Sequence, residues 1–168
     1  MSEIVVAGAS QLAADVGGVI ADHGGNAMDA AIGANLTAMI TEPGVCAIGG
    51  GGFVTVWPAQ SDPVTFDGYM EMPGRGLEAD QFGRGSREVT MAYGGGVTTG
   101  IGHGSVATPG ALAAFSLASE RFGALPWREL LGPVIDVVRR GFPMSQASRF
   151  YLQYAGEVIF GWEPESRA

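Results

Sequence analysis

The chain has 168 residues, of which 46% are hydrophobic and 15% charged, and its formal net charge is −8. This composition predicts one folded domain with a buried core and excludes an acidic disordered chain. The basic residues do not cluster beyond Arg139-Arg140, which argues against nucleic-acid binding because that function requires a basic surface.

The sequence also restricts cofactors and compartment. The single cysteine, Cys46, excludes an internal disulfide and a zinc site made of several thiolates, and no motif indicates another metal or an organic cofactor. The first residues lack a basic region followed by a long apolar run, and no stretch reaches the roughly 20 apolar residues of a membrane span. We therefore expect a cytoplasmic protein without a secretory signal, a membrane segment or a cofactor.

The N-terminal part of the chain predicts a strand followed by two helices. Residues 4–9 form a short apolar run typical of a strand. Ser10 is placed to cap a helix over 11–23, which a glycine pair ends. Asn26 is placed to cap a second helix over 27–41, whose many small residues favour close packing.

Four successive glycines at 49–52 separate the second helix from a strand-rich segment. Because glycine has no side chain, such a run either adopts unusual backbone angles or lets another backbone or a ligand approach closely. After it, residues 53–57 and 64–67 have strand-like composition and are joined by a proline-containing turn. We expect these two pieces to form a hairpin.

The middle of the chain predicts little regular structure before a third helix. Residues 68–104 are rich in glycine and lack periodicity, so we expect mostly loop, followed by a strand at 105–107. Thr108 is placed to cap a helix that carries Pro109 in its first turn and runs to Phe122.

The C-terminal part predicts two more helices and no closing element after residue 160. One helix begins at Pro126-Trp127 and ends at Gly141, and the last one starts after Ser145. Five apolar residues of the first of these helices are expected to point inward: Leu130, Leu131, Val134, Ile135 and Val138.

Four separated motifs together carry a resemblance to a known family. They are GGNAMDAA at 24–31, EP at 42–43 with IGGGGF at 48–53, SVATPG at 105–110, and FGALPWRELL at 122–131 with GFP at 141–143. In this order they resemble the γ-glutamyltranspeptidase family, whose large subunit begins with such motifs. The resemblance covers nearly the whole chain.

The resemblance implies an α/β (α+β) chain that forms the N-terminal portion of an N-terminal nucleophile hydrolase αββα sandwich, as one incomplete domain over 1–168. Members of that family are precursors that cut themselves into a large and a small subunit. The new N-terminal threonine of the small subunit attacks a γ-glutamyl amide such as glutathione, and its own amino group acts as the base. The resemblance therefore implies that this chain holds no catalytic residue, that its partner is the remainder of the same precursor, and that it is inactive alone.

The resemblance also implies two substrate-binding residues. In the family, an arginine that binds the glutamyl α-carboxylate follows an Asp-Gly or Asp-Phe pair and precedes a proline. Matching Asp67-Gly68 and Pro73 places Tyr69 at that position. A phenol cannot make the bidentate charged pair that a guanidinium makes with a carboxylate, although Arg75 is placed to restore the charge. We expect Tyr69 and Arg75 to line the acyl pocket.

The missing arginine leaves other functions open. A relative that cleaves a different amide, such as a cephalosporin acylase or an oxamate amidohydrolase, fits Tyr69 as well as a γ-glutamyl enzyme does. A small-molecule-binding module would use the glycine loops as an anion site, and phosphate-dependent stabilisation would identify it. A non-catalytic interaction subunit would form a stable complex that shows no turnover.

Other chemically active residues have structural interpretations. Asn26 and Asp29 are interpreted as helix caps, and Cys46 as a small buried apolar residue because no histidine is near it in sequence. His103 is the better placed of the two histidines for acid–base chemistry. The pair Thr98-Thr99 looks like a self-cleavage point, but it precedes motifs that resemble the early large subunit, so we do not assign it as a nucleophile.

Overall fold

A computed structural model describes residues 3–82 and 84–167, and the contacts among these residues divide them into two compact units. The first unit comprises the described residues up to Met70 together with Pro109–Ser145. The second comprises Glu71–Thr108 and the described residues from Gln146 onward. The expectation of one incomplete domain over 1–168 stays a prediction.

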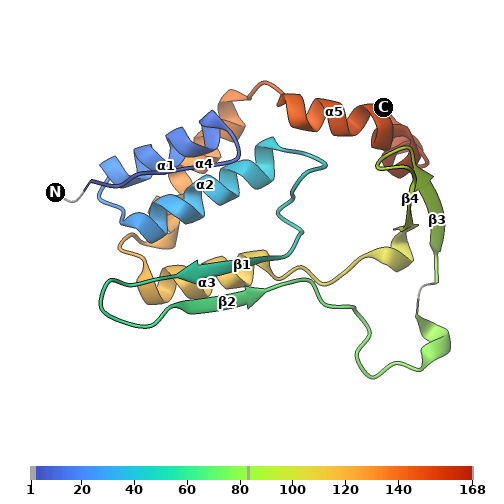
Figure 1. Cartoon of the computed structure of the whole chain (residues 1–168), viewed down its shortest axis with the longest axis horizontal. Coiled ribbons are helices and arrows are strands. Elements are labelled where there is room, and N and C mark those ends of the chain that lie inside the picture. Colours follow the sequence, from blue (N-terminus) through green and yellow to red (C-terminus); the bar gives the residue numbers. More distant parts are fainter. Residues whose placement is uncertain (1–2, 83, 168) are drawn as a thin grey trace. The chain divides into compact units, whose positions relative to one another are not determined.

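The first two helices begin where the sequence predicts them. α1 (Gln11–Asp22) starts after Ser10, whose hydroxyl accepts a hydrogen bond from the Ala13 N–H. α2 (Ala27–Thr41) starts after Asn26, whose side chain accepts from the second and third N–H groups of the helix. Each cap satisfies N–H groups that have no partner inside the helix. The two helices lie side by side in the first unit (Figure 1).

The prediction of a strand at 4–9 is wrong, because this segment has no regular secondary structure. A strand forms only when another segment pairs with its backbone N–H and C=O groups. Among the described residues, no strand pairs with 4–9. An apolar run supplies the side chains of a strand but not its hydrogen-bond partner.

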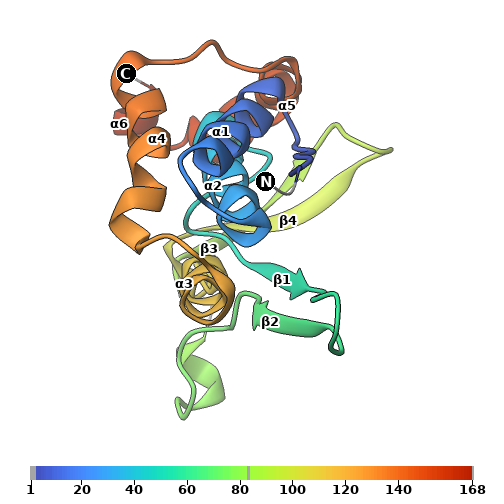
Figure 2. The same ribbon diagram turned by 90° about the vertical axis from the view of Figure 1, so that its left-hand side faces the viewer.

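The predicted hairpin is present. β1 (Gly52–Val56) pairs antiparallel with β2 (Val64–Gly68), and Val54 lies opposite Phe66. Val54 and Gly68 are buried on the face that packs against α3 (Ala111–Phe122), which Figure 2 shows end-on beside the hairpin. In each strand, the side chains that point away from α3 are exposed. The hairpin therefore has one covered face and one open face.

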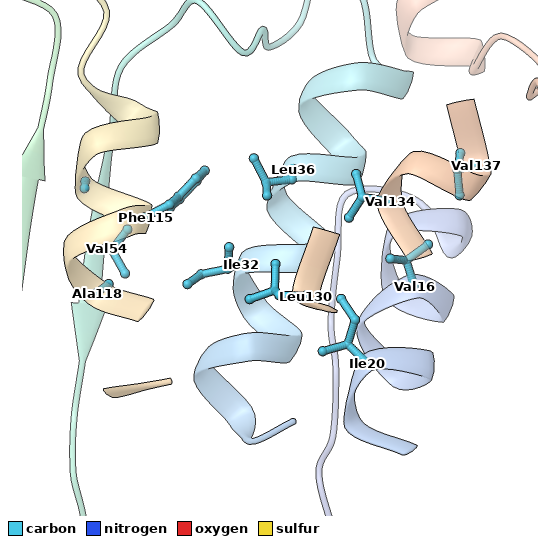
Figure 3. Packing of buried hydrophobic residues seen from close by; sticks show 11 residues of the cluster. Val16, Ile20, Ile32, Leu36, Val54, Phe115, Ala118, Leu130, Val134 and Val137 are labelled. Carbon is cyan, nitrogen blue, oxygen red and sulfur yellow. The ribbon is translucent and has the colours of Figure 1, made fainter. Parts of the chain in front are cut away.

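The core of the first unit is one apolar cluster contributed by four helices and β1 (Figure 3). The fourth helix, α4, spans Trp127–Arg140. The buried members of the cluster are Val16, Ile20, Ile32, Leu36, Val54, Ala114, Phe115, Ala118, Leu130, Val134 and Val137.

The inward face of α4 is narrower than predicted. Leu130, Val134 and Val137 are buried, whereas Ile135 is 42% exposed and Val138 is 50% exposed. Because successive residues turn by about 100° around a helix, Ile135 and Val138 each lie one step beyond a buried residue and outside the face that meets the core. The expectation that these two side chains point inward is therefore wrong.

The start of α3 also differs from the prediction. Gly110 occupies the N-cap position, and no side chain caps the helix. Thr108 instead exchanges two backbone hydrogen bonds with Glu71, at 2.8 and 3.2 Å. Residues 105–107 are not a strand, because Ser105 ends a 3-10 turn (His103–Ser105) and the next residues are irregular.

The second unit contains a hairpin where the sequence predicts loop. β3 (Ser86–Met91) pairs antiparallel with β4 (Val97–Gly102) through a turn in which Gly94, Gly95 and Gly96 have positive φ. The expectation of loop here is wrong, because most side chains of this hairpin are polar or absent and the apolar alternation typical of a strand is weak.

The remaining elements of the second unit are helical. α5 (Gln146–Ala155) confirms the predicted last helix, and a π-helical turn (Gly156–Phe160) and the short α6 (Pro164–Arg167) follow it. The short α6 lies in the segment where no closing element was expected. Within the described ranges, every helix is too short or too polar to cross a membrane.

Candidate functional site

The tetraglycine run is a packing element at the base of the β1–β2 hairpin. The Gly50 carbonyl accepts a hydrogen bond from the Ala111 N–H at 3.2 Å, which ties the run to the start of α3. A Cβ atom on Gly51 would lie 2.6 Å from the backbone nitrogen of Met70, so only glycine fits there. Of the two roles expected for the run, close approach of another backbone agrees with these contacts.

A second backbone contact fixes the end of β2. A Cβ atom on Gly110 would lie 2.5 Å from the carbonyl oxygen of Gly68, so the strand end and the start of α3 touch backbone to backbone. Together with the contact at Gly51, this holds the residues that follow Gly68 in one position. The chain therefore presents Tyr69 from a rigid support.

Tyr69 lies on the open side of the hairpin. Its N–H donates to Oδ1 of Asp67 at 2.9 Å, and its ring stacks on Phe53 with a centroid distance of 5.7 Å and an interplanar angle of 15°. The two residues are 59% and 60% exposed, respectively. The side chain predicted to bind substrate is thus accessible and held by an aromatic neighbour.

Phe53 is the residue of this surface that sequence reasoning missed. It lies directly opposite Asp67 in the register of the hairpin. Tyr69, on which it stacks, comes two residues after Asp67. The available signal was the alternation in β1, where Val54 points to the core and Phe53 and Thr55 do not. Alternation alone does not identify Tyr69 as the partner, because that depends on the pairing of the two strands.

Arg75 belongs to the second unit, whereas Tyr69 belongs to the first. The Arg75 guanidinium donates to the Glu71 carboxylate at 2.7 Å, and the side chains of this pair are 85% and 67% exposed. Its charge therefore already has a partner within its own unit. A shared pocket for Tyr69 and Arg75 stays a prediction.

Asn26 and Asp29 form a structural joint, as interpreted from the sequence. Asp29 is fully buried, and one of its carboxylate oxygens accepts from the N–H groups of Asn26, Ala124 and Leu125 at 2.9, 2.8 and 3.3 Å. The Asn26 amide donates to the Phe122 carbonyl at 2.7 Å. The motif at 24–31 thus binds the motif at 122–131 through hydrogen bonds between residues about 95 positions apart.

Cys46 is also structural. Its thiol donates to the Ala38 carbonyl of α2 at 3.3 Å. Burial, and secondarily the negative charge of Glu42, raise the pKa of this thiol above its ordinary value. A raised pKa lowers the fraction of reactive thiolate near neutral pH, which disfavours a nucleophilic role.

The candidates of the second unit do not form a catalytic arrangement. Thr98 lies within β4, and its hydroxyl shares a hydrogen bond of 3.0 Å with the hydroxyl of Thr90. The two threonines therefore form a cross-strand pair. His103 packs edge-on against Trp162, and its Nε2 is 4.0 Å from the Glu163 carboxylate. His103, Trp162 and Glu163 border an open cavity of about 500 Å³. Among the residues that the structure describes, no group of three or more His, Cys, Asp or Glu side chains is arranged to hold a metal ion.

Comparisons with known proteins agree with the motifs. A family model described as Gamma-glutamyltranspeptidase matches residues 13–167. Among curated relatives, a glutathione hydrolase proenzyme of Pseudomonas aeruginosa is 32% identical over 93% of this chain and 27% of its own length. An acylase ACY 1 proenzyme of Pseudomonas sp. (strain V22) is 35% identical over 80% of this chain and 24% of its own length. The chain thus spans about a quarter of the length of the curated relatives that it matches.

Solved structures give the same result for the fold. A γ-glutamyltranspeptidase from Pseudomonas nitroreducens, solved with L-DON, superposes with a TM-score of 0.74 and 26% identity, covering 99% of this chain and 47% of that one. This similarity confirms the predicted fold class, an N-terminal portion of the αββα N-terminal nucleophile hydrolase sandwich.

Proposed function

Because the chain belongs to the gamma-glutamyltranspeptidase family, we propose that it works as part of a self-processing enzyme that cleaves γ-glutamyl or related acyl amides, such as glutathione. The match over residues 13–167 carries this proposal. The names of the relatives support it further, since those compared are proenzymes. In this proposal the partner of the chain is the remainder of the same precursor, and the substrate is a small amide.

The chemistry of the proposed enzyme follows from the threonine nucleophile that the family resemblance implies, which lies outside this chain. The threonine Oγ attacks the amide carbonyl and gives up its proton to the threonine amino group. The C–N bond then breaks, and the amine leaves with that proton. Water or an amino acid takes the acyl group from the threonine ester and restores the hydroxyl. This chain contributes no catalytic residue but part of the acyl pocket, through Tyr69 and Arg75.

A second candidate is an amide hydrolase of different acyl specificity, such as a cephalosporin acylase-like or oxamate amidohydrolase-like enzyme. One observation favours it: Tyr69 occupies the position where the family resemblance implies an arginine, and a phenol provides no positive charge for a carboxylate. The acylase relative, at 35% identity, is consistent with such a change.

An amidase assay tests the proposal. γ-Glutamyl and glutaryl p-nitroanilides are incubated with the 168-residue chain and with the longer precursor in which the proposal places it. We expect turnover only by the self-cleaved longer protein. Turnover by the short chain would show that the nucleophile lies here, and Thr98, Thr99 and Cys46 would then be substituted one at a time.

The two pocket residues need a separate test in the longer protein. We expect the double variant Tyr69→Ala with Arg75→Ala to raise KM for the acyl donor, because both side chains are proposed to bind it. An unchanged KM for every donor would remove both residues from the pocket.

A further inference from the structure

The open face of the β1–β2 hairpin presents two stacked aromatic rings beside one carboxylate. Phe53 and Tyr69 are each more than half exposed, and their rings are nearly parallel. Asp67 lies directly opposite Phe53, where side chains of paired strands are about 5 Å apart. The surface beside Tyr69 therefore carries two aromatic rings, a single negative charge and, farther along the hairpin, the hydroxyls of Thr55 and Thr65, which share a hydrogen bond at 3.0 Å.

No described residue of the hairpin contributes a positive charge to this face. Asp67 is the only charged residue of the two strands. The four arginines of the first unit lie on α3 and α4 and not on the hairpin: Arg121, Arg128, Arg139 and Arg140. Arg75, in the second unit, is already paired with Glu71. A carboxylate bound against Tyr69 would thus meet Asp67 and find no free guanidinium on the hairpin.

The support beneath the rings makes this surface a fixed one. Tyr69 follows Gly68, which touches the backbone of Gly110, and its N–H is held by Asp67. Stacking against Phe53 restricts the Tyr69 ring further. Two rigid, flat rings provide a platform for an apolar chain or ring at low cost in side-chain entropy.

Resting on the second candidate of the proposed function, an amide hydrolase of different acyl specificity, we infer that Phe53 is a second specificity-determining residue and that the acyl group bound against Phe53 and Tyr69 is uncharged. Its free end is an alkyl chain or an aromatic ring in place of the carboxylate of a glutamyl group. An ammonium end would be attracted to Asp67 but would lose water against the two rings, so we expect it to bind less well than a neutral end.

Three anilides of equal chain length test the charge preference in the longer, self-cleaved protein. Pentanoyl, 5-aminopentanoyl and glutaryl p-nitroanilides all have five acyl carbons and carry a neutral, a positive and a negative end, respectively. We expect kcat/KM for the pentanoyl donor to exceed that for the glutaryl donor by at least about tenfold, with the 5-aminopentanoyl donor between them.

Two variants and a matched control test the residues. Phe53→Ala is expected to lower kcat/KM for the pentanoyl donor by about tenfold, because it removes half of the platform. Tyr69→Arg is expected to raise the glutaryl-to-pentanoyl ratio by about tenfold or more, since a guanidinium pairs with the carboxylate. The control is Trp57→Ala, which removes an 80% exposed ring just after the end of β1, about 13 Å farther along the chain, and should change kcat/KM for neither donor.

The outcomes separate this inference from the proposed function. Faster cleavage of the glutaryl or the 5-aminopentanoyl donor than of the pentanoyl donor would overturn the inference but leave an amide-cleaving enzyme in place. Equal effects of Phe53→Ala and Trp57→Ala would overturn the role of Phe53. Cleavage of none of the three donors, nor of γ-glutamyl p-nitroanilide, would overturn the proposed function and this inference with it.

Discussion

In the first unit, four helices and the β1–β2 hairpin share one buried apolar cluster, whereas the second unit depends on a hairpin, aromatic contacts and exposed ion pairs. Among the described residues of the second unit, the buried ones are Ile101, Ser148, Ala155 and Gly161. Apolar burial is the main favourable contribution to folding, so we expect most of the stability to reside in the first unit.

The candidate pocket residues divide in the same way. Tyr69 is supported by backbone contacts of the first unit, while Arg75 is held by one exposed pair in the second. The comparison therefore predicts that substitutions in the two units differ strongly in their effect on the free energy of unfolding. Four substitutions test it, each measured by urea denaturation followed by circular dichroism.

The largest effect is expected for Leu130→Ala in the core of the first unit. Leu130 is fully buried in the cluster, so its truncation should lower the free energy of unfolding by about 2–5 kcal/mol through lost burial and a cavity. Ile135→Ala on the same helix is the control. Because Ile135 is 42% exposed, its truncation should lower the free energy of unfolding far less. Equal losses for the two variants would contradict the assigned core.

Gly110→Ala is expected to come second. Its new Cβ atom would lie 2.5 Å from the Gly68 carbonyl oxygen, so the strand end and α3 must move apart, at a cost of about 1–3 kcal/mol. Gly132→Ala is the matched control, because a Cβ atom there meets open space and alanine favours the helix by up to about 1 kcal/mol. A Gly110→Ala protein as stable as the parent would show that the backbone contact is looser than described.

Asn26→Ala should lower the free energy of unfolding by about 1–2 kcal/mol, because it removes the cap of α2 and the bond to the Phe122 carbonyl. Asn26→Ser separates these contributions, since serine still caps the helix but does not reach Phe122 as an amide donor. We expect the free energy of unfolding of the serine variant to lie between those of the alanine variant and the parent protein. A serine variant no better than alanine would mean that the cap contributes little.

The smallest effect is expected in the second unit. Arg75→Gln breaks the pair with Glu71, whose side chains are both largely exposed, so stability should fall by less than about 1 kcal/mol. The difference should shrink further in high salt, which screens exposed charges. A larger loss, insensitive to salt, would contradict the view of the second unit as the part held by surface contacts.

Much of the helical structure was predictable, because the signals at helix ends are local. Ser10 and Asn26 mark the starts of α1 and α2, and Gly123 and Gly141 follow the ends of α3 and α4. Thr108 shows the limit of this reasoning. Its residue type suits a cap, but its backbone pairs with Glu71, a distant residue that no local pattern identifies.

The strands and the site depended on contacts distant in sequence. The apolar run at 4–9 lacks a pairing partner among the described residues, while the polar β3–β4 segment has one. Tyr69 was found by its position after Asp67-Gly68, but its partner Phe53 was not, because their stacking requires the β1–β2 register.

By itself, then, the sequence determined the family, the helix ends and the position of Tyr69, since motifs and caps act over a few neighbouring residues. Only the tertiary structure decided that Phe53 stacks on Tyr69 and that Gly68 and Gly110 touch. The physical reason is that pairing between strands and close backbone contacts join residues far apart along the chain, and no local sequence pattern identifies such partners.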